Sequence, residues 1–230
     1  MINNDYYNDE VIDLAVGEME VNQHKYGLLQ DKIISLITRD ENLKKVVHSY
    51  KYRFKDKSHL RDKIIRKNDE DFSLPEGDRK GPITSDNVKK RITDYSGVRI
   101  IHLYQEQFRV IHGVFNELFE QGELFKYEEP KAYTWDPEYQ PFFEELGLES
   151  VLRQSLYTSV HYVVKPREDS DITCEIQVRT LFEEAWGEID HALNYPIKTD
   201  KLVIQEQLKV LARVVGAGSR LADSIFKLSE

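Results

Sequence analysis

The stretch DITCEIQVRTLFEEAWGEIDHALN, residues 171–194, predicts a strand that leads directly into a helix. Side chains in a strand alternate between its two faces. One face carries apolar residues, namely Ile172, Cys174, Ile176 and Val178. The other face carries polar residues, namely Thr173, Glu175, Gln177 and Arg179. The first face is typical of a core, and the second fits either an ordinary solvated face or a site that presents a carboxylate, an amide and a guanidinium in line.

The rest of the chain mixes helices and strands without a regular alternation of the two. Apolar residues recur at helical spacing in residues 9–47, 58–66, 106–121, 181–194 and 202–228. Strand patterns occupy residues 98–104, 157–165 and 171–179, whereas 68–86 predicts a loop and 126–156 predicts irregular structure with one short helix. We therefore expect an α/β (α+β) fold in which helices flank a mixed β-sheet.

Length and composition favour a soluble protein of the cytoplasm. The 230 residues are 40% hydrophobic and 11% aromatic, which excludes a disordered acidic chain. No apolar run approaches the roughly 20 residues of a membrane-spanning helix, so no membrane partner is expected. The acidic N-terminal sequence lacks the apolar segment of a secretory signal. The single cysteine, Cys174, excludes a disulfide framework and faces the core in the predicted strand.

Charge is distributed unevenly along a chain whose formal net charge is −9. Residues 44–67 contain ten lysine or arginine residues and two aspartates, a local charge of +8 with histidine neutral. Residues 117–149 contain ten acidic residues and two lysines, a local charge of −8. The total argues against broad nucleic-acid binding, but the +8 stretch indicates a cationic site for an anion. Two solvated faces of opposite sign would give the same pattern.

Cations and one carboxylate within 53–94 have the chemistry of a polyphosphate site. Arg53 and Lys55 are two residues apart, and Lys63 follows on the next predicted helix. Arginine would hold phosphate oxygens through its planar fork and lysine as a point charge. Asp94 comes just before the turn into the strand 98–104. Magnesium requires only one or two protein carboxylates when substrate phosphates supply its other ligands, so Asp94 is a candidate metal ligand.

A second group of polar residues lies on the strand 157–165. Tyr157, Ser159 and His161 share one face of this strand. An aromatic ring, a hydroxyl and an imidazole in line suit a nucleobase with its ribose or phosphates. A packing tyrosine and a core histidine would give the same spacing.

Taken together, these motifs resemble the synthetase domain of the RelA/SpoT family. The matching residues are ArgPheLys at 53–55 with Lys63, AspTyrSerGlyValArg at 94–99, TyrThrSerValHis at 157–161, GluIleGlnValArgThr at 175–180, and AlaTrp at 185–186 with His191. They occur in the family's order and spacing, and their form is similar to the stand-alone small synthetases. The resemblance implies a single domain over 1–230, with N-terminal helices over 1–49, a catalytic core over 50–195 and a C-terminal helix over 200–230.

The resemblance implies a GTP pyrophosphokinase. Such an enzyme transfers the β,γ-pyrophosphate of ATP to the ribose 3′-hydroxyl of GDP or GTP, releases AMP and forms the alarmone (p)ppGpp. By position, the resemblance implies an ATP site with two arginines around the adenine and three residues near the phosphates: Arg53, Arg99, Lys55, His59 and Lys63. It implies Mg²⁺ bound by Asp94 and Glu175, with Glu175 also activating the 3′-hydroxyl. It implies an acceptor site in which Tyr157 stacks on the base and the other residues line the pocket: Arg153, His161, Gln177, Arg179 and His191.

Departures from the family pattern lie mainly on the acceptor side. His59 stands where the family has serine, Arg153 replaces a lysine, and Ser155-Leu156 replaces Asn-Gly before the stacking tyrosine. Leucine in place of glycine removes backbone freedom beside the acceptor base. Two alternatives therefore stay open: a toxic small synthetase whose acceptor is an adenine nucleotide or the 3′ end of tRNA, and a catalytically silent sensor of nucleotides or RNA. The resemblance also suggests a homo-oligomer formed through the terminal helices.

Overall fold

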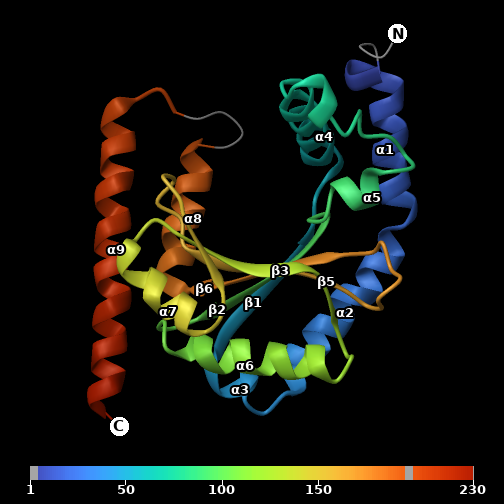
Figure 1. Ribbon diagram of the computed structural model, residues 1–230. Coiled ribbons are helices and arrows are strands. Elements are labelled where there is room, and N and C mark those ends of the chain that lie inside the picture. Colours follow the sequence, from blue (N-terminus) through green and yellow to red (C-terminus); the bar gives the residue numbers. More distant parts are fainter. Residues whose placement is uncertain (1–4, 195–198, 230) are drawn as a thin grey trace.

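A six-stranded mixed β-sheet lies at the centre of the computed structural model, which describes residues 5–194 and 199–229 (Figure 1). The strands are β1 (Val47–Phe54), β2 (Ser96–His102), β3 (Phe125–Thr134), β4 (Glu149–Leu152), β5 (Ser159–Lys165) and β6 (Cys174–Thr180). Their spatial order is β1-β2-β6-β5-β3-β4. The pairs β2/β6 and β3/β4 are parallel, and the remaining neighbours are antiparallel. The predicted mixed sheet with flanking helices is confirmed.

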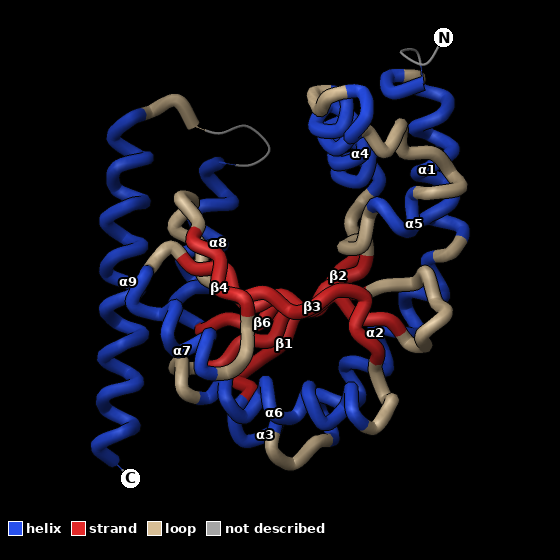
Figure 2. The backbone as a smooth tube through the Cα atoms, in the orientation of Figure 1, coloured by secondary structure: helices blue, strands red, loops and turns tan. Residues whose placement is uncertain are grey.

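Helices cover one face of the sheet and border the other face on two sides (Figures 1 and 2). The covering helices are α2 (Gln23–Arg39), α3 (Leu43–Val46) and α6 (Gln107–Glu120). On one side of the open face lie α1 (Asp9–Val21), α4 (Lys57–Phe72) and α5 (Val88–Arg91). On the opposite side lie α8 (Leu181–Asn194) and α9 (Leu202–Ser229), with α7 (Gln140–Glu145) beside them. Short 3₁₀ helices occupy Asp5–Tyr7, Glu76–Asp78 and Pro137–Tyr139.

The apolar side chains form two clusters. The larger one lies between the sheet and the covering helices, and it includes Leu29, Ile33, Val98, Ile100, Phe108, Phe115, Tyr162, Cys174, Ile176 and Val178. The smaller one joins α1, α4 and α5, and it includes Ile12, Val16, Tyr26, Leu60, Ile64, Val88 and Tyr95. Cys174 is fully buried, as the alternation of β6 predicts, and burial raises the pKa of its thiol to about 12.

Side-chain caps fix the start of the two helices that border the open face most closely. The Asp56 carboxylate accepts a hydrogen bond from the His59 backbone N–H at 3.0 Å and begins α4. At the start of α8, the Thr180 hydroxyl accepts from the Glu183 N–H at 3.3 Å, and the Glu183 carboxylate accepts from the Thr180 N–H at 2.9 Å. This reciprocal capping box turns the chain from β6 into α8 without an intervening loop.

The long C-terminal helix packs against α8 and leaves much of its apolar surface uncovered. The Trp186 indole N–H of α8 donates to the Leu208 carbonyl of α9 at 3.1 Å. Val203, Val214 and Leu221 of α9 are all more than 60% exposed. Within the part of the chain that the structure describes, no helix is long and apolar enough to cross a membrane.

The prediction of irregular structure for 126–156 is wrong, because β3 and β4 both lie there. Pro130 falls within β3, and the pairing with β5 shifts register between Glu128 and Lys131. Proline cannot donate to the ladder, so it accompanies a bulge and hides the strand pattern. The strand β1 was not predicted either, since it is an edge strand with mostly exposed side chains. In addition, α4 continues to Phe72 and takes up the first part of the predicted loop 68–86.

Leu156 adopts a left-handed backbone conformation in the connection between β4 and β5. Its φ is 55°, and it is the only non-glycine residue with a positive φ in the described ranges 5–194 and 199–229. A residue with a Cβ loses roughly 1–2 kcal/mol in this conformation, whereas glycine adopts it readily. The strained residue directly precedes Tyr157, so the backbone strain lies beside the predicted acceptor site.

Replacing Leu156 by glycine should relieve this strain. We expect Leu156→Gly to raise the free energy of unfolding by about 1 kcal/mol, measured by chemical denaturation. Leu152→Gly is the matched control, because Leu152 is also a partly exposed leucine but lies in the strand β4, where glycine should destabilise by about 0.5–1 kcal/mol. Equal destabilisation by both substitutions would contradict the strain at Leu156.

Candidate active site

Four neighbouring strands contribute to one polar row on the open face of the sheet. In the register of the sheet, Lys51 of β1 pairs with Arg99 of β2, and Arg99 pairs with Gln177 of β6. Gln177 in turn pairs with His161 of β5. Directly paired residues project from the same side of a sheet. Side chains from segments more than 100 residues apart are therefore held in line by backbone hydrogen bonds.

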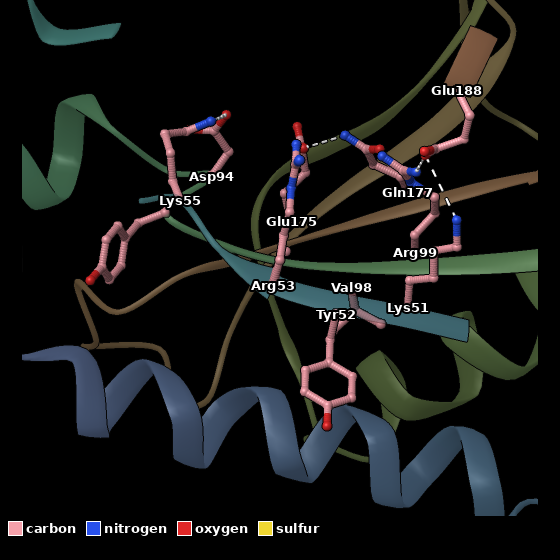
Figure 3. A pocket seen from close by; sticks show the side chains of 12 residues that line it. Lys51, Tyr52, Arg53, Lys55, Asp94, Val98, Arg99, Glu175, Gln177 and Glu188 are labelled. Atoms are coloured by element: carbon pink, nitrogen blue, oxygen red, sulfur yellow. Dashed lines mark hydrogen bonds and ion pairs between the residues drawn. The ribbon is translucent and has the colours of Figure 1, made fainter. Parts of the chain in front are cut away.

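A parallel row contains the acidic centre of the site. Arg53 pairs with Gly97, and Gly97 pairs with Glu175. A Cβ added at Gly97 would meet only the Glu175 carbonyl oxygen, at 3.8 Å. The missing side chain therefore leaves room on this face between Arg53 of β1 and Glu175 of β6, whose side chains project to the same side (Figure 3).

Three adjoining cavities follow this face from α4 toward β3. The first has a volume of about 250 Å³ and is lined by Lys51, Tyr52, Arg53, Lys55, Asp94, Tyr95, Gly97, Val98, Arg99, Glu175, Gln177 and Glu188 (Figure 3). The second is lined by Arg53, Arg99, Tyr157, Gln177, Arg179, Trp186, Gly187, Glu188, Asp190, His191 and Asn194. The third is lined by Tyr133, Arg153, Ser155, Tyr157 and His161. Shared residues connect each cavity with the next, so the three form one groove.

Two lysines surround a carboxylate at the α4 end of the groove. The Lys63 ammonium lies 2.5 Å from Asp94 Oδ2, and the Lys55 ammonium lies 3.5 Å from the same oxygen. Burial raises the pKa of the Asp94 carboxyl, but Lys63 and Lys55 outweigh it, so the pKa lies below its ordinary value. The other oxygen, Oδ1, is buried and has no hydrogen-bond partner. Asp94 is thus an ionised carboxylate with one oxygen available for a ligand.

Glu175 lies in the middle of the groove and is held by two neighbours. Gln177 Nε2 donates to Glu175 Oε2 at 2.7 Å, and His161 Nδ1 lies 3.2 Å from Oε1. Burial raises the pKa of Glu175, but the hydrogen bonds from His161 and from the Gln177 amide outweigh it, so the pKa lies below its ordinary value. An ionised Glu175 accepts from His161 Nδ1–H, which leaves His161 Nε2 to accept from the Tyr157 hydroxyl at 3.1 Å.

Aromatic rings and guanidinium groups alternate at the far end of the groove. The Arg179 guanidinium lies 5.5 Å from the centre of the Tyr157 ring, and the Arg153 guanidinium lies 4.5 Å from that of Tyr133. The ring of His161 meets both tyrosines edge-on, at 4.9 Å from Tyr133 and 5.9 Å from Tyr157. These planar groups suit a flat, aromatic ligand.

The groove brings together nearly all the residues that the sequence singled out. Arg53, Lys55, Asp94, Arg99, Glu175 and Gln177 line its first cavity, and Tyr157, Arg179 and His191 line the second. Lys63 reaches it through Asp94, and Arg153 and His161 line the third cavity. His59 lies in the first turn of α4 against Asp56 and is not among the residues that line the three cavities.

Sequence reasoning missed four charged or aromatic residues that line the groove or pair with its cations. Lys51 shares a strand face with Arg53, and this two-residue spacing was the available signal. Glu184 and Glu188 are four residues apart and therefore lie on one side of α8. Tyr133 lies in the segment that was predicted to be irregular, so no strand pattern pointed to it.

Comparison with known protein families gives a match over most of the chain. Residues 52–200 match the model of a region found in RelA/SpoT proteins, which spans more than half of the chain. The chain belongs to the RelA/SpoT family. None of the curated proteins matches its sequence significantly.

Several solved structures have a fold similar to that of this RelA/SpoT protein. A GTP pyrophosphokinase family protein from Streptococcus pneumoniae is 20% identical, with a TM-score of 0.62 and 90% of each chain covered. The small alarmone synthetase 1 of Bacillus subtilis, bound to its product pppGpp, is 19% identical, with a TM-score of 0.54 and 92% of each chain covered. The same enzyme bound to AMPCPP has a TM-score of 0.59 at 16% identity, with 92% of this chain and 94% of that chain covered.

Two adjacent glutamates at the start of α8 have opposite pKa shifts in this RelA/SpoT protein. Burial raises the pKa of Glu183 to about 7, and its hydrogen bonds to Thr180 offset only part of that effect. Burial also raises the pKa of Glu184, but Arg179, Lys51 and Arg99 outweigh it and lower the pKa below its ordinary value. The two glutamates thus have different roles. Glu183 caps the helix through its hydrogen bonds with Thr180, and Glu184 is an ionised partner of the site's cations.

The Glu183 shift should make stability depend on pH. Folding raises the pKa of Glu183, so its contribution to the free energy of unfolding is complete below the ordinary pKa of 4.5. This contribution is lost as the pH rises through about 7. We expect this loss to reach about 3 kcal/mol, and Glu183→Gln to remove it while keeping an acceptor for Thr180. The measurement is chemical denaturation at pH 5 and pH 8.

Glu120→Gln, an exposed position on α6, is the control for that comparison. Its pH dependence should equal that of the wild type. An identical fall in stability between pH 5 and pH 8 in wild type and Glu183→Gln would contradict the shift at Glu183.

Proposed function

We propose that the chain is a (p)ppGpp synthetase that transfers the β,γ-pyrophosphate of ATP to the ribose 3′-hydroxyl of GDP or GTP and releases AMP. The observation that carries this proposal is the single groove in which the Lys55–Lys63–Asp94 cluster, Glu175 and the Tyr157–Arg179 pair follow one another. A donor with a polyphosphate, a general base and an acceptor with a flat base require that order. The enzyme would act in the cytoplasm.

The first cavity suits the donor nucleotide. Lys55 and Lys63 provide two ammonium groups for the phosphates of ATP, at the end marked by Asp94. Arg53 and Arg99 project from neighbouring strands into the same cavity. The flat face of a guanidinium is weakly hydrated and stacks on planar rings, so these two arginines would hold the adenine between them.

Asp94 and Glu175 would hold the Mg²⁺ ion that accompanies ATP. The buried, unpartnered Oδ1 of Asp94 fits this role, and Asp94 and Glu175 line the same cavity. Carboxylate oxygens are ligands that Mg²⁺ prefers, and two suffice when phosphates provide the rest. When bound, the ion would neutralise negative charge on the phosphates.

Glu175 would act as the general base. Its lowered pKa keeps the carboxylate ionised at neutral pH, and His161 and Gln177 fix its orientation. The carboxylate accepts the proton of the 3′-hydroxyl, and the hydroxyl oxygen forms a bond to the β-phosphorus of ATP. The bond between that phosphorus and the oxygen bridging to the α-phosphorus breaks, and AMP leaves with the bridging oxygen. Catalysis by positioning and charge stabilisation is usual for such transfers.

The acceptor would occupy the second and third cavities. Tyr157 offers a ring for the acceptor base, and His161, Gln177, Arg179, Arg153 and His191 surround it with donors for the ribose and phosphates. A guanine nucleotide is the acceptor that the family resemblance implies.

Two observations favour a different acceptor, namely an adenine nucleotide or the 3′ end of tRNA. Arg153 rests on the Tyr133 ring, and the strained Leu156 shapes the backbone directly before Tyr157. Both features alter the wall against which the acceptor base would stack.

The third candidate, a silent sensor, would bind nucleotides without forming AMP. Self-association through the terminal helices stays a prediction, to which the exposed apolar residues of α9 lend support.

Glu175→Gln tests the proposed mechanism. Glutamine keeps the size of the side chain but cannot accept the proton at neutral pH, so we expect product formation to fall at least about 100-fold. The measurement is AMP release with Mg²⁺, ATP and GDP or GTP. Glu149→Gln, an exposed position on β4 paired with Lys131, should retain wild-type activity. Equal rates for wild type and Glu175→Gln would rule out Glu175 as the base.

A panel of acceptors tests the proposed substrate. Wild-type protein with labelled ATP should modify GDP or GTP in preference to AMP, ADP or tRNA, with one AMP released per product. AMP release with tRNA and no product on GDP or GTP would replace the first proposal by the toxin-type activity. Nucleotide binding without AMP from any acceptor would favour the sensor.

A further inference from the structure

One buried carboxylate on α8 contacts cations from three different strands. Glu184 Oε1 lies 2.8 Å from the Lys51 ammonium of β1 and accepts from Arg99 Nη1 of β2 at 2.9 Å. Glu184 Oε2 lies 2.9 Å from Arg179 Nε of β6. Its side chain is only 6% exposed. A carboxylate so far from water is retained at a large desolvation cost, which the three cations offset.

The cations that meet at Glu184 belong to different parts of the groove. Lys51 and Arg99 line the first cavity, which suits the donor nucleotide, and Arg99 also reaches the second cavity. Arg179 lines the second cavity and lies against Tyr157, where the acceptor base would stack. Burial lowers the pKa of the Arg179 guanidinium, and the charge of the neighbouring Arg99 lowers it further. Glu184 is the carboxylate that contacts both guanidinium groups.

We propose that Glu184 is a positioning residue that fixes the donor arginine Arg99 and the acceptor arginine Arg179 at the same time. The proposal rests on the proposed function and adds to it a residue that sets the affinity for both substrates. Glu184 accepts a hydrogen bond from Arg99 Nη1 at the edge of that guanidinium. It lies 2.9 Å from Arg179 Nε as an ion pair without hydrogen-bond geometry, so it holds Arg179 by charge. An edge contact orients the plane of a guanidinium and leaves its flat faces free to stack.

Two neighbours of Glu184 on α8 contact only one of the two arginines and so provide matched comparisons. Glu188 accepts from Arg99 Nη1 at 2.7 Å and lies 3.8 Å from Lys51, and its side chain is 54% exposed (Figure 3). Gly187 faces Arg179, because a Cβ added there would lie 2.7 Å from Arg179 Nη1. Alanine at 187 would therefore displace the Arg179 guanidinium without removing a charge, and alanine is the better helix former.

The test compares Glu184→Gln, Glu188→Gln and Gly187→Ala in steady-state kinetics. We expect Glu184→Gln to raise the KM for both ATP and GDP about tenfold, because Arg99 and Arg179 both lose the charged partner that holds them. Glu188→Gln should raise only the KM for ATP, and Gly187→Ala only the KM for GDP. Glu184→Asp, which keeps the charge but shortens the side chain, should raise both KM values if the glutamine variant does not fold.

A purely structural role would give a different result. If Glu184 only stabilised the fold, its variants would lower the melting temperature and the active fraction, and hence the apparent kcat, while both KM values stayed at the wild-type level. That result, or a rise in only one of the two KM values, would overturn the proposal.

The same comparison on binding separates this inference from the proposed reaction. Calorimetry with GDP and with an ATP analogue that has a methylene bridge between the α- and β-phosphates measures both affinities without turnover. If the wild type forms no product and Glu184→Gln still weakens the binding of both nucleotides, the proposed reaction is refuted and the positioning role of Glu184 stands. If the wild type forms product and Glu184→Gln binds both nucleotides normally, the positioning role is refuted and the proposed reaction stands.

Discussion

The alternation of side chains along β6 is the constraint on which the rest of the structure depends. β6 lies between β2 and β5 in the interior of the sheet, so its Cys174, Ile176 and Val178 fill the core below. The pleat then sends Glu175, Gln177 and Arg179 to the opposite face. A shift of register by one residue would place these three groups in the core and the apolar ones in the groove, at a large cost in desolvation. The same packing that stabilises the fold therefore fixes the chemistry of the site.

Charge is balanced locally on this face, although the chain carries a net charge of −9. Asp94, Glu175 and Glu184 are all buried to a degree that would raise their pKa values, yet neighbouring donors and cations lower each of them. The site thus keeps three ionised carboxylates among six cations, namely Lys51, Arg53, Lys55, Lys63, Arg99 and Arg179. Such a surface presents fixed charges of both signs, and these charges are held in place before a ligand arrives.

The sequence was informative where burial imposes a regular pattern and silent where it does not. β6 and its polar row could be predicted because one face is fully buried. β1 escaped prediction because an edge strand with exposed residues shows no alternation, and β3 escaped because Pro130 and a bulge interrupt its ladder. The partners of Glu184 could not be predicted at all, since Lys51 and Arg99 meet it only through the tertiary fold.

In the proposed reaction, one groove joins a donor polyphosphate to an acceptor hydroxyl across Glu175. Following the phosphorus atoms of ATP tests it most directly. With ATP labelled at the α-phosphorus, the label should appear only in AMP, and with ATP labelled at the γ-phosphorus, it should appear only in the modified GDP or GTP. Label from the γ-position released as free phosphate or pyrophosphate, or ADP formed in place of AMP, would contradict pyrophosphate transfer.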